Sequence, residues 1–264
     1  DHFWLSIADS DVLLWARGVA VNSGMDVDIS EPDVSPLQLQ GPKSRDVLRA
    51  AFGDAPTELK YYRFMEFDWD GVPLIISRTG WSSELGYEIF LRDGTKGEKL
   101  WEHLMAVGGP LGLKPGHTSS IRRIEAGMLS YHADMTLANN PYEMGMGRLV
   151  DLDMEADFIS KAALTLIKER GVSQQLVGLE IDGAPFVGSN DFFWPILKEG
   201  VKVGTVTSAI YSPRLQKNIA LAMLSIDHTA SGRVLQVDKL SETRACTVVP
   251  IPFYDPKKSL ATAS

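Results

Sequence analysis

The residue pattern changes near Val172, and this change constrains the fold more than any other feature of the chain. Before it, apolar residues at helical spacing, as in residues 96–109, stand between alternating, strand-like runs. After it, only strand-like runs follow, over residues 174–183, 194–212, 218–226, 232–238 and 243–253. The pattern predicts an α+β region over residues 1–172, an all-β domain over 173–254 and a frayed tail over 255–264.

Shorter signals place individual elements within the α+β region. Residues 3–8 predict a strand, and residues 25–41 predict two strands separated by a bend at proline. Asp70-Gly71 predicts the turn of a hairpin, because glycine suits its left-handed position. Serines predict helix N-caps at the following positions: Ser44, Ser119 or Ser120, and Ser160.

One strand-like stretch, residues 78–91, carries a carboxylate in its middle. Tyr87, Ile89 and Leu91 point to one side of such a strand, and Gly86, Glu88 and Phe90 point to the other. On this pattern alone, the favoured interpretation is that Glu88 faces water on a half-exposed strand.

The composition narrows the class of partner. The net charge is −8 and the pI about 5.2, whereas nucleic-acid and anionic-membrane surfaces require clustered Lys and Arg. The single cysteine, Cys246, allows no intrachain disulfide and reads as a small buried hydrophobe in a strand. Residues 1–15 lack the basic head of a signal peptide. We therefore expect a cytoplasmic protein with no nucleic-acid or membrane partner, and a homodimer remains an open alternative.

Several common catalytic motifs are absent from the sequence. It contains no phosphate-binding P-loop, no HExxH zinc motif and no GxSxG nucleophile elbow, and Gly145-Met-Gly147 lacks the third glycine of a dinucleotide fingerprint. The five histidines are scattered, so we expect no metal site. His132 and Asp134 read as a surface pair at a helix end.

Six short sequence motifs are the most distinctive part of the chain. They are FWLSIADSD, LQGPKS, TGWSSELGYEI, RIEAGMLSY, NNPYEMGMG and VGTVTSAIYSPRLQKNIALAML. Together and in this order they resemble the folate-dependent aminomethyltransferase family typified by the glycine cleavage T-protein. The first and last of these motifs are more similar to its dimethylsulfoniopropionate demethylase branch. The resemblance covers the chain from Phe3 to about Phe253.

The resemblance implies both a fold and an activity. The implied fold is α+β, with T-protein-like folate-binding domains (mixed sheets with flanking helices) followed by a C-terminal β-barrel. The implied activity is transfer of a methyl or aminomethyl group from a sulfonium or methylated-amine donor to tetrahydrofolate. The small-molecule donor and tetrahydrofolate are the implied partner and cofactor.

The resemblance also implies roles for particular residues. Glu88 matches the carboxylate that binds the pterin ring, which suits an acceptor facing an amino group and a ring N–H. Trp81 can face a cationic donor or stack on folate, although a core tryptophan is an equal alternative. Tyr142 lies in a loop near folate or is a turn tyrosine after Pro141, and Phe90 lies in the substrate pocket. Arg123 is expected to have a structural role, bridging to Glu125 or to a neighbouring acid.

The sequence departs from the family at several places. Ser119 stands where T-proteins have a folate-binding arginine, which disfavours glycine cleavage and favours the demethylase branch. Phe90 replaces a tyrosine of that branch, and a lost hydroxyl can change specificity. The family's acidic catalytic residue falls upstream of Asp1, so no catalytic residue is assigned. Two alternatives follow: the chain is a fragment of a longer protein that carries this acid, or it is complete and lacks it.

Alternative functions remain open at this point. One is a glycine cleavage aminomethyltransferase, and another is a non-catalytic folate-binding protein or domain on the same fold. A third is a C-terminal module of a larger methylated-amine dehydrogenase.

Overall fold

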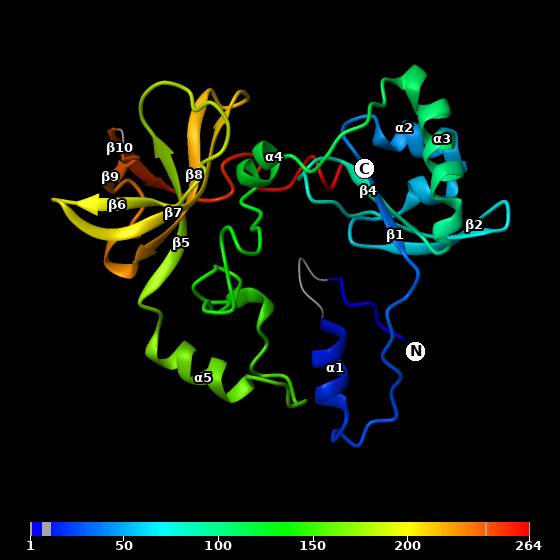
Figure 1. Cartoon of the computed structure of the whole chain (residues 1–264), viewed down its shortest axis with the longest axis horizontal. Helices are drawn as coiled ribbons and strands as arrows, with labels where there is room; N and C mark the ends of the chain where they lie inside the picture. The colour runs from blue at the N-terminus through cyan, green and yellow to red at the C-terminus, as the bar shows by residue number, and fades with distance from the viewer. Residues whose placement is uncertain (1, 7–11, 241, 264) are drawn as a thin grey trace. The chain divides into compact units, whose positions relative to one another are not determined.

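The computed structural model describes residues 2–6, 12–240 and 242–263 of the chain (Figure 1). The chain forms two compact units. The first comprises Asp1–Thr118 together with Lys258–Ser264, and the second comprises Ser119–Lys257.

The first unit is built on a four-stranded antiparallel sheet with the order β1-β4-β3-β2 (Figure 1). Its strands are β1 (Ser35–Gln40), β2 (Phe64–Trp69), β3 (Val72–Ser77) and β4 (Gly86–Leu91). Helices α2 (Ser44–Phe52) and α3 (Gly97–Gly108) bury their apolar residues in the same core as Tyr87, Ile89 and Leu91 of β4. The helices therefore cover the apolar face of the sheet that alternation in β4 predicts.

The hairpin prediction is confirmed. Asp70 and Gly71 join β2 to β3, with φ of 51° and 79°, so both occupy the left-handed region that such a turn requires. Residues 25–41 contain one strand, β1, instead of two. Residues 3–6 form no strand, and residues 7 and 8 of that prediction lie outside the described residues.

Two of the serine-cap predictions are wrong. Ser44 is the first residue of α2, and its hydroxyl donates to the carbonyl of Leu85 over 3.0 Å instead of capping the helix. Ser160 precedes α5 (Lys161–Arg170) but makes no capping hydrogen bond. Ser119 does cap α4 (Ser120–Glu125), accepting from Arg122 N at 3.3 Å.

Helix α1 (Val12–Ala20) also belongs to the first unit. None of its residues is buried, and Leu14 and Trp15 are largely exposed. Within the described part of the chain, no helix is both long and apolar enough to cross a membrane. Short 3-10 helices occur at Ala55–Glu58, Gly94–Lys96, Gly109–Leu111, Gly147–Leu149 and Ile226–His228.

The second unit contains a closed antiparallel barrel with the order β10-β5-β8-β7-β6-β9 (Figure 1). Its strands are β5 (Gln174–Ile181), β6 (Trp194–Lys198), β7 (Val201–Ser212), β8 (Lys217–Ser225), β9 (Val234–Asp238) and β10 (Thr243–Val249). Each strand falls within a run that the sequence pattern assigns to strand, except that β8 begins one residue earlier, at Lys217. The predicted C-terminal barrel is therefore confirmed.

The barrel has two apolar clusters. One is formed by inward-facing residues such as Leu179, Ala220 and Val237. The other packs Ile124 of α4 and Met144 of the 140–147 loop against Ile219 and Leu221 of β8. This second cluster fixes α4 and the 140–147 loop on the barrel.

The prediction that the C-terminal tail is frayed is wrong for residues 258–263. Ala261 is 4% exposed, and the carbonyl of Ala263 accepts from Arg45 Nη2 at 2.9 Å. Arg78 also donates to the carbonyls of Ala261 and Ala263. The tail is short and polar, so sequence pattern could not indicate that two distant arginines bind its backbone.

Candidate functional site

The face of the sheet in the first unit that α2 and α3 leave uncovered carries Glu88 and Phe90 side by side on β4. Both residues are half-buried, while Tyr87, Ile89 and Leu91 between and beside them are at most 1% exposed. The predicted alternation of β4 is therefore confirmed. Glu88 lies between two partner strands, because it pairs with Gln38 on β1 and with Ser77 on β3.

The Glu88 carboxylate is held by hydrogen bonds to both of its oxygens. Gln38 Nε2 donates to Oε1 over 3.2 Å, and the Thr79 hydroxyl donates to Oε2. Thr79 also shares a hydrogen bond of 2.5 Å with Ser77 Oγ. Each carboxylate oxygen can accept more than one hydrogen bond, so an oriented carboxylate of this kind retains acceptor capacity for a ligand. Glu88 is thus not a mobile surface side chain.

Gln40 occupies the space next to Glu88 on the same face. Its Nε2 donates to the carbonyls of Thr79 and Tyr87 over 3.3 Å each, and its Oε1 accepts from Ser82 Oγ at 2.5 Å. A Cβ at Gly86 would overlap the Gln40 carboxamide, and the same holds at Gly80. Gly86 therefore makes room for the Gln40 carboxamide.

Trp81 lies in the segment that Gln40 fixes to the sheet. This half-buried residue follows Gly80 and precedes Ser82, outside the regular strands. Among the described residues, the buried apolar clusters do not include it. Trp81 lies in the same unit as Glu88. The bonds of Gln40 to Thr79, Ser82 and Tyr87 hold its segment close to β4.

Phe90 has an aromatic neighbour from the N-terminal segment. The ring of Trp4 meets the ring of Phe90 edge-on at a centroid distance of 6.0 Å. The guanidinium of Arg92 lies 5.8 Å from the centroid of Trp4. A carboxylate, an aromatic ring and a cation thus stand at alternate positions 88, 90 and 92, the last of them one residue beyond the end of β4.

Tyr142 lies in the second unit, in the loop between Asn140 and Gly147. Its ring packs on Gly147, where a Cβ would come within 2.8 Å of Tyr142 Cδ1. Its hydroxyl is buried and has no hydrogen-bond partner among the described residues. A buried hydroxyl without a partner costs free energy, so it is a position at which a ligand or a water is expected.

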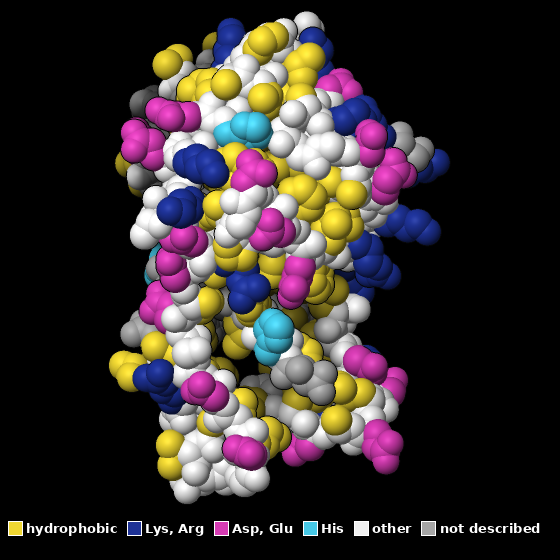
Figure 2. Space-filling view, turned by 90° about the vertical axis from the view of Figure 1, so that its right-hand side faces the viewer, with side chains coloured by type: hydrophobic (Ala, Val, Ile, Leu, Met, Phe, Trp, Pro, Cys, Tyr) yellow, Lys and Arg dark blue, Asp and Glu magenta, His cyan; other side chains and the backbone are white. Residues whose placement is uncertain are grey.

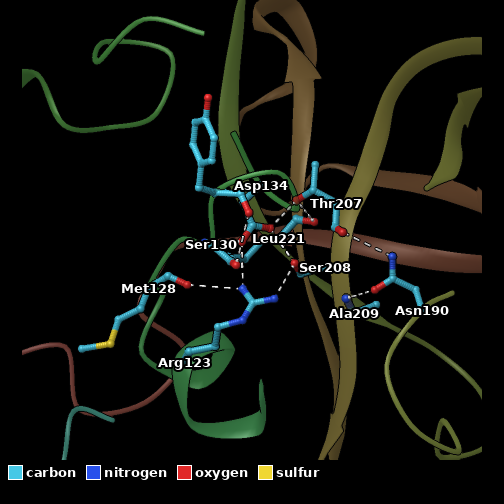
Figure 3. Close-up of polar contacts among 10 residues, drawn as sticks. Arg123, Met128, Ser130, Asp134, Asn190, Thr207, Ser208, Ala209 and Leu221 are labelled. Atoms are coloured by element: carbon cyan, nitrogen blue, oxygen red, sulfur yellow. Dashed lines mark hydrogen bonds and ion pairs between the residues drawn. The ribbon is translucent and has the colours of Figure 1, made fainter. Parts of the chain in front are cut away.

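A buried ion pair that sequence reasoning missed joins α4 to the 128–134 segment (Figure 3). Arg123 Nη1 lies 2.8 Å from Asp134 Oδ2, and the side chain of Asp134 is 0% exposed. The prediction that Asp134 forms a surface pair with His132 is therefore wrong. Arg123 does bridge to an acid, as expected, and the acid is Asp134. Glu125 instead pairs with Arg122 at 2.9 Å.

Hydroxyl groups of β7 complete the surroundings of Asp134 (Figure 3). Thr207 Oγ1 donates to Asp134 Oδ1 over 2.7 Å, and Ser208 Oγ donates over 2.6 Å. The amide of Ser130 donates to Oδ2 at 2.9 Å, and Ser208 accepts from Arg123 Nη2 at 2.9 Å. With every partner satisfied, this network is a structural connection between the loop and the barrel.

Cys246 is buried inside the barrel, as the sequence predicts. Burial raises the pKa of its thiol from 9.0 to about 12, so the thiolate nucleophile is suppressed at neutral pH. Among residues 2–6, 12–240 and 242–263, no group of three His, Cys, Asp or Glu side chains is placed to hold a metal ion.

The surface shown in Figure 2 has acidic and basic side chains interspersed, with hydrophobic side chains between them. This mixed distribution agrees with the modest net charge of −8.

Two residues of the site, Gln38 and Thr79, were not identified from the sequence. Gln38 is 50 positions from Glu88 in the chain, and only the register of β1 on β4 brings the two together. The signal that could have identified Gln38 is the alternation of LQLQ, in which the glutamines share one face.

Comparisons with known proteins agree with this architecture. The model of the GCVT N-terminal domain matches residues 1–154, and that of the glycine cleavage T-protein C-terminal barrel domain matches residues 174–255. The crystal structure of the glycine cleavage system aminomethyltransferase T from Bartonella henselae superimposes with a TM-score of 0.78 at 21% identity, over 92% of this chain and 65% of that one. The predicted T-protein-like fold is thereby confirmed.

Two relatives are more similar to this chain in sequence. The dimethylsulfoniopropionate demethylase of Ruegeria pomeroyi is 39% identical over 94% of this chain and 67% of its own length. An aminomethyltransferase of Bacillus cereus is 33% identical over 92% of this chain and 66% of its own length. The chain thus spans about two thirds of the length of these relatives. It belongs to the glycine cleavage T-protein family.

Proposed function

We propose that this chain acts in tetrahydrofolate-dependent one-carbon transfer, moving a methyl or aminomethyl group from a sulfonium or methylated-amine donor to tetrahydrofolate. The observation that carries the proposal is the Glu88 carboxylate, which Gln38 and Thr79 hold in one orientation on the open face of β4. Membership of the T-protein family supports the same reaction class. In this proposal residues 1–172 form the folate-binding region.

The residues present fit the pterin ring of tetrahydrofolate. A pterin presents an amino group and a ring N–H side by side, and a carboxylate accepts both as a paired hydrogen bond. Because Glu88 is half-buried and already oriented, little side-chain entropy is lost when it binds. Tyr142 is a separate proposed folate contact, because its buried hydroxyl has no hydrogen-bond partner among the described residues.

Tetrahydrofolate, when bound, supplies the nitrogen N5 that accepts the one-carbon group. The protein's contribution is positional: Glu88 fixes the ring, and Gln38 and Thr79 fix Glu88. Trp81 provides an aromatic face for a cationic donor, with an attraction of about 0.5–2 kcal/mol depending on desolvation. Phe90 lines the same face of β4 as Glu88 and is proposed to contact the substrate. No residue of this chain is proposed as a general acid or base.

The donor is proposed to be a sulfonium such as dimethylsulfoniopropionate. The greater identity to the demethylase, 39% against 33% for the aminomethyltransferase, supports this choice. The residue at position 119 also supports a sulfonium donor. T-proteins carry a folate-binding arginine there, whereas this chain has Ser119, which caps α4. The second candidate is a glycine cleavage aminomethyltransferase, which the 33% identity favours.

A donor assay tests the proposal. The full product of the gene is incubated with tetrahydrofolate and dimethylsulfoniopropionate, and 5-methyltetrahydrofolate and the demethylated thioether are quantified together. Equal amounts of both products are expected. Formation of methylenetetrahydrofolate from an aminomethylated lipoyl carrier, without turnover of the sulfonium, would favour the aminomethyltransferase. Folate binding without either reaction would favour a non-catalytic folate-binding protein.

We further propose a cytoplasmic location and no nucleic-acid or membrane partner. The buried, unpaired thiol of Cys246 and the net charge of −8 support these proposals. Fractionation of cells that express the full gene product, followed by immunodetection, tests the location.

A further inference from the structure

Arg78 is a buried cation whose acceptors come largely from the C-terminal segment. The residue is 5% exposed and directly follows β3. Its Nη1 donates to the carbonyl of Leu59 over 3.1 Å, and its Nη2 donates to the carbonyls of Ala261, at 3.2 Å, and Ala263. A buried guanidinium needs such acceptors, and the C-terminal segment supplies two of the three carbonyls that the Nη atoms of Arg78 contact.

The C-terminal segment presents these carbonyls from a turn of its own. Both the amide and the hydroxyl of Thr262 donate to the carbonyl of Lys258, over 3.0 and 2.8 Å. Ala261 is buried against the first unit, and Arg45 of α2 donates to the carbonyl of Ala263 at 2.9 Å. The segment is therefore folded and held at two points, by Arg45 and by Arg78.

Thr79 follows Arg78 and lies beyond the end of regular strand pairing. The β3–β4 ladder ends at the pair Ser77–Glu88, so the positions of Arg78 and Thr79 depend on other contacts. The backbone of Arg78 bonds to residues 62 and 63, and the carbonyl of Thr79 accepts from Gln40. The side chain of Arg78 adds the contacts to the C-terminal segment. The hydroxyl of Thr79 in turn donates to Glu88.

We infer that residues 258–263 and Arg78 form a positioning element that holds Thr79, and through it the Glu88 carboxylate, in the orientation that binds tetrahydrofolate. The inference rests on the proposed role of Glu88. It assigns the C-terminal segment a part in ligand binding, where the sequence suggests only a loose tail. Arg78 acts through Thr79 and does not contact the ligand itself.

The test compares tetrahydrofolate affinity by calorimetry among variants of the full gene product. Arg78→Met removes the contacts to the tail, and a chain ending at Lys257 removes the tail itself. Arg49→Met is the matched control, because this arginine of α2 pairs with Asp46 and Asp54 and makes its contacts away from the C-terminal segment. We expect Arg78→Met and the shortened chain to bind at least fivefold more weakly, and Arg49→Met to change affinity less than twofold.

A coupling measurement separates positioning from general stabilisation. In a Thr79→Val background, Arg78→Met should change affinity less than twofold, because its route to Glu88 is already removed. An equal loss in both backgrounds, or loss of thermal stability with unchanged affinity, would overturn the inference. Glu88→Gln, measured alongside, tests the proposed function independently. If Glu88→Gln weakens binding and Arg78→Met does not, the inference fails and the proposed function stands.

Discussion

Glu88 on β4 and Gln38 on β1 are direct partners across an antiparallel ladder, and Gln38 Nε2 donates to Glu88 Oε1 over 3.2 Å. A carboxylate on a half-buried strand face is thereby fixed by its neighbour strand instead of moving freely in water. The pairing gives the Glu88 carboxylate a defined direction, which a paired hydrogen bond to a planar ligand requires.

Gln38→Met removes this contact at similar side-chain size. The loss of one hydrogen bond to a charged group is worth about 1.5–3 kcal/mol at most, so we expect roughly tenfold weaker tetrahydrofolate binding. Titration calorimetry measures the affinity. Gln236→Met is the control, because Gln236 is an exposed strand glutamine in the barrel. Equal affinities for wild type and Gln38→Met would contradict the orientation of Glu88 by Gln38.

Gly86→Ala is expected to displace the Gln40 side chain. The new Cβ would overlap the Gln40 carboxamide, which would then lose its bonds to Thr79 and Tyr87. We expect destabilisation of about 1–2 kcal/mol, from the unsatisfied groups that remain. In a Gln40→Ala background the same substitution should cost less. Denaturant unfolding measures both, and identical costs in the two backgrounds would show that Gln40 is not the obstacle.

The Arg123–Asp134 ion pair predicts a large stability effect. Removing one partner of a buried pair leaves an uncompensated charge, so Arg123→Met is expected to cost about 3–5 kcal/mol. The exposed pair Lys217–Glu180 serves as the control, and Lys217→Met should cost no more than about 1 kcal/mol. Thermal unfolding compares the two variants. Similar losses for both would contradict the structural role of the buried network.

Cys246 predicts slow thiol chemistry in the folded protein. Because burial raises the pKa of the thiol to about 12, little thiolate exists at pH 8, and the side chain is 1% exposed. A maleimide or aromatic disulfide reagent should label the native protein far more slowly than the unfolded protein. Labelling at the same rate in both states would place Cys246 at the surface.

The raised pKa of Cys246 also has a consequence for stability. Above pH 9.0, the ordinary value for the thiol, the unfolded state ionises while the folded state stays protonated. The unfolded state then binds fewer protons, so the contribution of Cys246 to stability decreases as pH rises from about 9 toward 12. Cys246→Ala should show a shallower loss of stability than wild type over this range.

The strands and the hairpin turn could be predicted, because side-chain alternation and turn residues within each segment specify them. The alternation of Tyr87, Ile89 and Leu91 fixed the buried face of β4, and Asp70-Gly71 fixed the hairpin turn. The barrel strands were predictable because alternation and turn residues recur throughout residues 174–249. In these segments the side-chain period and the burial agree.

The features that sequence missed depend on contacts between distant residues. Asp134 was expected at the surface, yet its partners Thr207 and Ser208 come from a strand more than 70 positions later in the chain. The tail at 258–263 is held by Arg45 and Arg78, about 180 or more positions earlier. Sequence pattern reports the period of a segment and not its tertiary partners, so such contacts could not be predicted.

The most direct test of the central claim is calorimetric titration of tetrahydrofolate into the full gene product and into its Glu88→Gln variant. Glutamine keeps the size of Glu88 but replaces one acceptor oxygen with a donor, so it cannot accept the paired hydrogen bond from the pterin. We expect micromolar binding by wild type and at least tenfold weaker binding by the variant, a difference of about 1.4 kcal/mol or more. Equal binding by the two proteins would contradict the role of Glu88 and return it to an ordinary strand surface.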